Sequence, residues 1–176
     1  MQNFEFLILD QIQMHLRCGF LDTVLPAITR LSNHGEIWIV LALMLFVFKK
    51  YRQGATVTLA LAIDYVCCNL TLKPLIGRIR PFVLNPAVEL LVEAPLDASF
   101  PSGHTAISFA AVFALKASGS RLWKPALVLA IIIAYSRLYL YVHWPSDVLA
   151  GALLGAVLGL AAGWIVKTIS ERMKRK

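Results

Sequence analysis

The chain has 176 residues, of which 59% are hydrophobic and only 15% are charged, and its mean hydropathy is +0.70. Soluble domains carry roughly 25% charged residues, so this composition excludes an ordinary soluble domain and predicts one all-α helix bundle in a membrane. The formal net charge is +7, but the positions of the charges argue against a nucleic-acid partner. No cleavable signal peptide is expected, because the first eighteen residues lack a basic stretch followed by an apolar core.

The N-terminal 35 residues predict an arm and not a full span. The apolar residues of the first segment recur at helical spacing and are Phe4, Leu7, Ile8, Ile12 and Leu16. This pattern predicts an amphipathic helix that lies in the membrane interface. Residues 20–34 are short for a span and contain Asp22, Pro26 and Arg30. We therefore expect an interfacial arm at 1–35, a membrane core at 36–168 and a basic cytoplasmic tail at 169–176; the alternative is a sixth span over 20–34.

Five apolar runs follow the arm, at about 36–50, 54–76, 103–119, 123–142 and 146–168. A full span takes about 20 residues, so the first and third runs need flanking residues to cross. These runs predict five transmembrane helices.

The basic residues form three clusters at the ends of apolar runs. They are Lys49, Lys50 and Arg52; Lys116, Arg121 and Lys124; and Lys167, Arg172, Lys174, Arg175 and Lys176. Positive residues concentrate in the cytoplasmic loops of membrane proteins. The clusters therefore predict a multi-pass protein of the cell membrane with a cytoplasmic C-terminus, and they place 77–102 and 136–147 together on the extracytoplasmic side.

Within the runs, two features are unusual. Asp64 lies in the middle of 54–76, where a carboxylate is a functional candidate, and a structural hydrogen bond explains it equally well. In the last run a glycine recurs every fourth residue, at Gly151, Gly155, Gly159 and Gly163. Such a smooth face allows another backbone to come close, and we favour a helix of the same chain over a homodimer. The cysteines Cys18, Cys67 and Cys68 have neither a disulfide nor a metal-ligand pattern, and we expect no metal or cofactor.

The first polar group on the extracytoplasmic side is KPLIGRIRP, residues 73–81. Lys73 and Arg80 are seven residues apart, so they share one face of a helix and lie about 10 Å apart if the helix continues. Pro81 disfavours helix at the residue before it, which predicts a helix end at Arg80. Arg78 lies off that face, and we interpret it as a cation that snorkels at the membrane border.

The second group is SFPSGHTA, residues 99–106. Ser102 predicts an N-cap, and the free N–H groups of the helix start would attract an anion. Gly103 lets the backbone approach a ligand closely, and His104 supplies a proton that titrates near neutral pH.

The third group is SRLYLYVHWPSD, residues 136–147. Arg137 offers a planar fork that matches phosphate oxygens. His143 can act with it only if the helix breaks between them, and Pro145 favours such a break because it suits the first turn of the next helix. Asp147 would then hold one ring nitrogen of His143 and leave the other free as a nucleophile. Together the three groups predict a pocket for a phosphate group.

These three stretches, in this order, resemble the signature motifs of the type 2 phosphatidic acid phosphatase superfamily. The resemblance covers residues 73–147 and, with the surrounding helices, about 36–168. It is highly specific, because all three motifs are present at the right spacing. The N-terminus departs from the pattern, since relatives often have a full first span.

The resemblance implies a metal-independent phosphate transfer in two steps. It makes His143 the nucleophile that becomes a phosphohistidine, with Asp147 orienting it. It makes His104 the group that protonates the leaving oxygen and then activates water. The residues that would hold the phosphoryl oxygens are Lys73, Arg80, Ser102, the Gly103 amide and Arg137.

The implied substrate is a membrane lipid phosphate, with undecaprenyl diphosphate first and phosphatidylglycerol phosphate and phosphatidate next. Glu89, Glu93 and Asp97, in the loop between the first two motifs, could shape the entry of the substrate or be solvated, and we favour the solvated interpretation. Five spans argue against a soluble vanadium haloperoxidase. The alternative of another class is a non-enzymatic lipid or anion transporter, which would need cations deeper within the spans.

Overall fold

The structure, a computed structural model, describes residues 2–33 and 35–174, and within these ranges the chain is helical with no strand. The helices are α1 (Gln2–Leu16), α2 (Gly19–Arg30), α3 (Glu36–Val47), α4 (Tyr51–Asp64), the π-helix η1 (Tyr65–Leu72), α5 (Lys73–Ile76), α6 (Pro81–Leu84), α7 (Gly103–Ala117), α8 (Trp123–Tyr139) and α9 (Pro145–Met173). Each of the five apolar runs is helical over most of its length, which confirms the all-α fold. Arg175 and Lys176 of the predicted basic tail lie outside the described residues.

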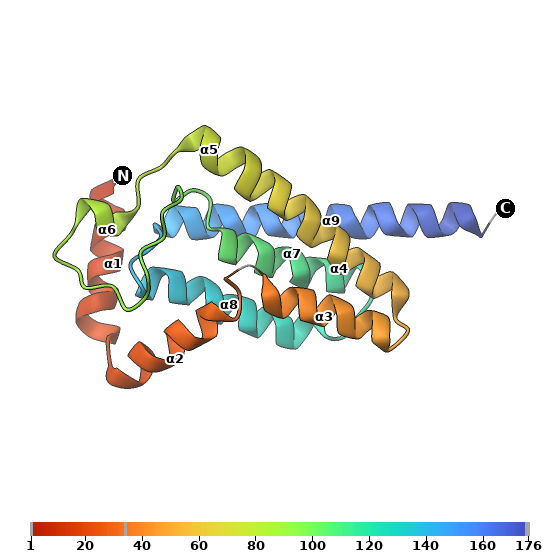
Figure 1. Ribbon diagram of the computed structural model, residues 1–176, viewed down its shortest axis with the longest axis horizontal. Helices are drawn as coiled ribbons and strands as arrows, with labels where there is room; N and C mark the ends of the chain where they lie inside the picture. The colour runs from red at the N-terminus through yellow and green to blue at the C-terminus, as the bar shows by residue number, and fades with distance from the viewer. Residues whose placement is uncertain (1, 34, 175–176) are drawn as a thin grey trace.

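Helix α7 lies in the middle of the bundle, with α4, α8 and α9 packed around it (Figure 1). Its sequence, GHTAISFAAVFALKA, is rich in alanine, and small side chains let neighbouring helices come close. Ala106, Ala110 and Ala114 are fully buried. A tryptophan of α3 also reaches this core, where Trp38 Nε1 donates a hydrogen bond to Ser108 Oγ at 3.0 Å.

The glycine stripe of α9 packs directly against α7. A Cβ atom added at Gly155 would lie 2.1 Å from the carbonyl oxygen of Ala106, and one at Gly159 would lie 2.5 Å from that of Ala110. Both distances are shorter than any real Cβ contact, so the two backbones touch only because glycine has no side chain. The favoured packing within the chain is confirmed. Because α7 covers the stripe, this face is not open to a second copy of the protein.

Helix α1 lies across the end of the bundle where α8 ends and α9 begins (Figure 1). Its polar side chains point inward: the Tyr141 hydroxyl donates to Asp10 at 2.7 Å, and Gln13 donates to the carbonyl oxygen of Tyr139 at 2.7 Å. On the other side Phe4 and Leu7 are exposed. The helix therefore exists as expected and turns apolar side chains outward, while its location in a membrane interface stays a prediction.

The helices differ in whether they are long enough to cross a membrane. Helices α2 and α3 have twelve residues each, about 18 Å of helix, which is less than the roughly 30 Å of a bilayer core. Among the described residues, two helical stretches are long and apolar enough to cross a membrane, Tyr51–Leu84 and Pro145–Met173. The outer side chains of α9, such as Leu149, Leu153 and Val157, are large, apolar and exposed. An apolar exterior around buried polar groups is typical of a protein embedded in lipid.

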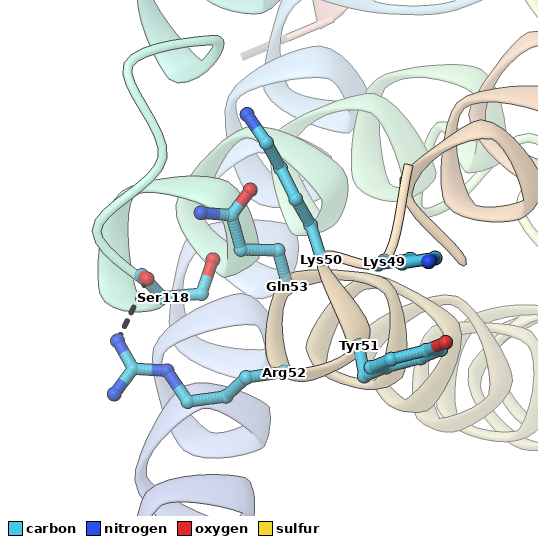
Figure 2. A pocket seen from close by; sticks show the side chains of 6 residues that line it. All are labelled: Lys49, Lys50, Tyr51, Arg52, Gln53 and Ser118. Carbon is cyan, nitrogen blue, oxygen red and sulfur yellow. Dashed lines mark hydrogen bonds between the residues drawn. The ribbon is translucent and has the colours of Figure 1, made fainter. Parts of the chain in front are cut away.

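The turns that follow α3 and α7 meet at the end of the bundle opposite α1 (Figure 1). Figure 2 shows their contact, in which Arg52 Nη2 donates to the carbonyl oxygen of Ser118 at 2.8 Å. A cavity of about 430 Å³ at this place is lined by Lys49, Lys50, Tyr51, Arg52, Gln53 and Ser118. Two of the three basic clusters therefore share one end of the bundle, as the predicted topology requires.

Candidate active site

Lys73 and Arg80 approach each other across a turn and not along a continuous helix. Helix α5 ends at Ile76, Gly77 has a φ of +60°, and residues 77–80 are irregular before α6 begins. A left-handed glycine is a common way to end a helix, so the predicted helix end at Arg80 is wrong by four residues. Both cations are nonetheless buried and point to the same carboxylate.

That carboxylate belongs to Asp97, which the sequence analysis interpreted as solvated. It pairs with Lys73 Nζ and, at 2.7 Å, with Arg80 Nη2. Partial burial raises the pKa of Asp97, but the hydrogen bonds and charges of Lys73 and Arg80 outweigh burial and leave the pKa at about 2. Asp97 is half exposed but pairs with both cations, so it is not simply solvated as favoured, and Glu89 and Glu93 are exposed as expected.

His143 lies in the break between α8, which ends at Tyr139, and α9, which begins at Pro145. The predicted break is confirmed. The Nε2 atom of His143 lies 3.1 Å from Arg80 Nη1. Arginine only donates, so Nε2 must accept with its lone pair and the ring proton must be on Nδ1. Burial and then the nearby positive charges lower the pKa of His143 well below its ordinary 6.5. The ring is therefore neutral, with a nucleophilic nitrogen facing the cations.

Asp147 stands behind this ring. Its Oδ2 lies 3.5 Å from His143 Nδ1, accepts a hydrogen bond from the Ser99 hydroxyl and accepts another from the Trp144 N–H at 2.9 Å. Asp147 is completely buried. A buried carboxylate with these donors is fixed in place, and its charge favours a positive imidazole in front of it.

Arg78 is part of this arrangement, so its interpretation as a snorkelling cation is wrong. Its Nη1 donates to Asp147 Oδ1 at 2.5 Å, and its Nη2 donates to Glu5 Oε2 at 2.6 Å. The guanidinium also lies 5.2 Å from the ring centre of Trp144. Glu5 in turn accepts from the Ser146 hydroxyl and N–H at 2.5 and 3.0 Å. Glu5 of helix α1 is thus linked to the Asp147 carboxylate through Arg78.

The start of α7 lies against the same group. Ser102 is the N-cap residue, as predicted, but its hydroxyl shares a hydrogen bond with Thr105 Oγ1 at 2.9 Å and caps no backbone N–H. A Cβ added at Gly103 would lie 3.6 Å from Lys73 Nζ, so the backbone approaches this ammonium closely. His104 Nε2 lies 3.2 Å from Asn33 Oδ1. An amide oxygen accepts only, so His104 carries its proton on Nε2.

Arg137 is buried near the end of α8, and its Nη1 donates to Thr29 Oγ1 at 2.8 Å. Its buried Nε has no hydrogen-bond partner among the described residues. Arg137 lies within electrostatic range of both Arg80 and Asp97. One N–H of this cation is thus free for a further acceptor.

Asp64 takes no direct part in this arrangement. It is completely buried in α4, and neither of its carboxylate oxygens has a hydrogen-bond partner in the described part of the chain. The structural hydrogen bond offered as one explanation of Asp64 is therefore absent there.

The protein is a helical bundle with an apolar exterior. Cations, two histidines and a buried carboxylate lie together at one end of it. These features are those of a membrane protein that binds and transfers phosphate groups. The family model described as the PAP2 superfamily matches residues 53–171, and the chain belongs to this superfamily, the type 2 phosphatidic acid phosphatases. The protein is a lipid phosphate hydrolase of the membrane.

Three comparisons show how close the likeness is. An undecaprenyl-diphosphatase of Sulfolobus acidocaldarius is 36% identical over 153 residues, which cover 82% of this chain and 74% of that protein. The crystal structure of Aquifex aeolicus LpxE has a TM-score of 0.75 and 31% identity, covering 89% of this chain and 93% of that one. A phosphatidylglycerolphosphate phosphatase structure from Bacillus subtilis has a TM-score of 0.63 and 25% identity, covering 98% and 94%.

Proposed function

We propose that the protein removes a phosphate group from a membrane lipid on the extracytoplasmic side, through a phosphohistidine at His143. One observation carries the proposal. The Nε2 atom of His143 lies 3.1 Å from a buried guanidinium nitrogen of Arg80, while Asp147 lies behind the opposite ring nitrogen. An unprotonated nitrogen is thus aimed at a place where a phosphoryl group would find cations.

In the first step the His143 Nε2 lone pair leaves its hydrogen bond with Arg80 Nη1 and forms a bond to phosphorus, and the bond from phosphorus to the leaving oxygen breaks. His104, protonated on both ring nitrogens when the substrate is bound, gives one proton to that oxygen and becomes neutral, and Asp147 stabilises the positive imidazole of His143. In the second step His104 takes a proton from water, the water oxygen bonds to phosphorus, and the phosphorus–nitrogen bond breaks. The phosphoryl oxygens are held throughout by Lys73, Arg80, Ser102, the Gly103 amide and Arg137. Fixed donors around developing charge are the main source of rate in phosphoryl transfer.

Undecaprenyl diphosphate is the substrate we favour, because the Sulfolobus relative carries that activity in its name and is 36% identical. A cavity of about 510 Å³ beside the cations is lined partly by apolar side chains, including Tyr65, Leu70 and Pro74. A lipid whose phosphate lies at the membrane border fits this position. Phosphatidylglycerol phosphate is the second candidate, favoured by the 98% coverage of the Bacillus subtilis phosphatase.

The sidedness follows from the charges. The basic turns after α3 and α7 lie at the opposite end of the bundle from the start of α9 (Figure 1), which follows His143 by two residues, and basic ends stay in the cytoplasm. We propose five crossings, with α3 and α7 extended by flanking residues, and the C-terminus inside. Labelling of Glu93→Cys, with Cys18, Cys67 and Cys68 replaced, by a reagent that cannot cross the membrane tests this. Protection from the external reagent would reverse the orientation.

Phosphate release by the purified protein tests the activity. We expect hydrolysis of undecaprenyl diphosphate in EDTA, block by orthovanadate, and no turnover by a folded His143→Ala variant. Retained turnover in that variant would refute the nucleophile, and a strict metal requirement would refute the mechanism. A competition between undecaprenyl diphosphate, phosphatidylglycerol phosphate and phosphatidate ranks the substrates. Transport of a lipid phosphate without phosphate release would favour the non-enzymatic alternative.

A further inference from the structure

Asp97 lies where the phosphoryl group of the proposed substrate has to bind. Its carboxylate pairs with Lys73 and Arg80, two of the residues proposed to hold that group. The side chains of these cations are only 11% and 4% exposed, whereas the side chain of Asp97 is 51% exposed. The carboxylate therefore covers two buried cations from the solvent side.

Arg80 has no free donor for a phosphoryl oxygen. A guanidinium has five N–H groups, and five acceptors surround this one. Nε donates to the Asp97 carbonyl oxygen at 2.9 Å, and Nη2 donates to Asp97 Oδ1 at 2.7 Å and to the Ala98 carbonyl oxygen at 3.3 Å. Nη1 faces the Val142 carbonyl oxygen at 2.7 Å and His143 Nε2 at 3.1 Å. A ligand can reach Arg80 only by replacing one of these acceptors.

The Asp97 carboxylate can leave Arg80 at lower cost than the Val142 carbonyl or the His143 ring. Water can solvate it when it leaves, because its side chain is half exposed. The Val142 carbonyl and the His143 ring are buried, and a buried polar group that loses its partner costs about 1–3 kcal/mol. An anion that arrives at Arg80 therefore replaces Asp97 first.

Only the side chain of Asp97 has to move for this exchange. The backbone is held at Asp97 and at the two residues after it, by the hydrogen bonds from Arg80 to the carbonyls of Asp97 and Ala98 and by the bond from Ser99 N to the Arg78 carbonyl oxygen at 2.8 Å. The cavity of about 510 Å³ is lined by Tyr65, Asn69, Leu70, Lys73, Pro74, Asp97 and Ala98. It gives the carboxylate room to turn aside.

We propose that Asp97 is an internal substitute for the phosphoryl group, which occupies Lys73 and Arg80 in the empty enzyme, yields to substrate and competes with the phosphate product. The proposal rests on the proposed function of the same site. A phosphate group brings a charge of about −1.5 to −2 and three acceptor oxygens, so it displaces a single carboxylate. The returning carboxylate then lowers the affinity for inorganic phosphate and so favours its release.

Asp97→Asn tests this, because the amide keeps the shape and loses the charge. Binding of inorganic phosphate to the detergent-purified protein is measured by calorimetry, and inhibition by orthovanadate is measured alongside. We expect Asp97→Asn to bind phosphate about tenfold more tightly, because the competing side chain has lost one charge-assisted contact with the cations. Glu93→Gln is the matched control, since Glu93 is exposed in the same loop and loses the same charge. It should bind like the wild type.

Unchanged or weaker phosphate binding by Asp97→Asn would overturn the proposal, because the carboxylate would then hold the cations in position for the ligand. Asp97→Ala repeats the test without the amide hydrogen bonds and must shift binding in the same direction. Phosphate binding requires no turnover, so the two proposals fail separately. Tighter binding by Asp97→Asn without any lipid hydrolysis by the wild type defeats only the function, and hydrolysis without tighter binding defeats only the role of Asp97.

Discussion

Two walls of the site differ in how they are built. One is the contact between α7 and α9, where Gly155 and Gly159 allow backbone to touch backbone and where Ser102 N donates to the Asp147 carbonyl oxygen at 3.1 Å. The other is the irregular segment 85–98, which reaches the site through Asp97. In the first wall the two helices are in backbone contact and cannot shift, whereas in the second wall the Asp97 side chain is half exposed and can move. The molecule is thus rigid where the nucleophile is oriented and adjustable where an anion has to enter.

The carboxylates of Asp147 and Asp97 differ in the same way as the two walls. Asp147 is completely buried and accepts from Ser99, Trp144 and Arg78. Within the described part of the chain, the Asp97 carboxylate pairs with Lys73 and Arg80, the cations that a phosphate would take. A carboxylate fixed by neutral and charged donors can orient a nucleophile, whereas a carboxylate held by the ligand's own partners can be exchanged.

Asp147→Asn, on the rigid wall, should have the largest effect on activity. The amide has no charge to stabilise the positive imidazole that forms when His143 attacks, and a comparable loss in a His–Asp pair costs about 10⁴ in rate. We expect kcat for phosphate release from undecaprenyl diphosphate to fall at least about a thousandfold.

The control for this change is Asp22→Asn. Asp22 accepts from the Tyr139 hydroxyl at 2.7 Å and makes no contact with His143, so it should leave kcat unchanged. Equal losses in Asp147→Asn and Asp22→Asn would mean that Asp147 acts only through folding.

Gly155→Ala should break the rigid wall itself. The new Cβ would lie 2.1 Å from the Ala106 carbonyl oxygen, so α7 and α9 have to separate, and overpacking of this kind costs about 1–3 kcal/mol. We expect a clear fall in Tm of the detergent-purified protein. Gly19→Ala is the matched control, because nothing lies within 4 Å of a Cβ placed there. A Tm unchanged by Gly155→Ala would show that the helices part without cost.

Glu5→Gln should have a smaller effect, because Glu5 does not bond to Asp147 itself and acts on it through Arg78 and through Ser146, the neighbour of Asp147. Burial raises the pKa of Glu5, but the hydrogen bonds from Ser146 and the pairing with Arg78 outweigh burial and lower it, so the carboxylate is charged at neutral pH. Loss of a residue that supports a catalytic group without touching the substrate lowers activity about tenfold. We expect kcat to fall about tenfold with KM nearly unchanged.

Asp10→Asn separates this effect from loosening of α1. Asp10 is on the same helix and accepts from the Tyr141 hydroxyl at 2.7 Å, without contact to Arg78. If Asp10→Asn lowers kcat as much as Glu5→Gln does, docking of α1 matters and the link through Arg78 does not.

The sequence predicts those parts of the site that depend on short spacings. The break between Arg137 and His143 follows from Pro145, and His143 and Asp147 are only four residues apart. The glycine stripe follows from a repeat of four. Each of these is a local property of the backbone, and the structure has the break and the helix contact where the spacing puts them.

The sequence does not predict the contacts that join distant segments. Glu5 reaches Arg78 across 73 positions, and Asp97 is positioned by a loop with no regular period. The helix end at Gly77 was missed because Lys73 and Arg80 also fit a longer helix. One signal was available for Asp97, since it is the acidic residue closest in sequence to the Ser-Phe-Pro-Ser stretch that leads into α7.

Asp97, in the adjustable wall, should also make the stability of the protein depend slightly on pH. The pKa of Asp97 is about 2, below its ordinary 3.8, so its pairing with Lys73 and Arg80 stabilises the fold above about pH 4 and is lost as the pH falls toward 2. We expect the wild type to melt above Asp97→Asn by a constant margin from pH 6 to about 4.5, in a phosphate-free buffer, and the margin to shrink on further acidification. Because the side chain is half exposed and screened by solvent, the margin should be about 2 °C at most. A margin that grows with acid would mean that Asp97 is not charged when it contacts the cations, and the comparison between the two carboxylates would fail.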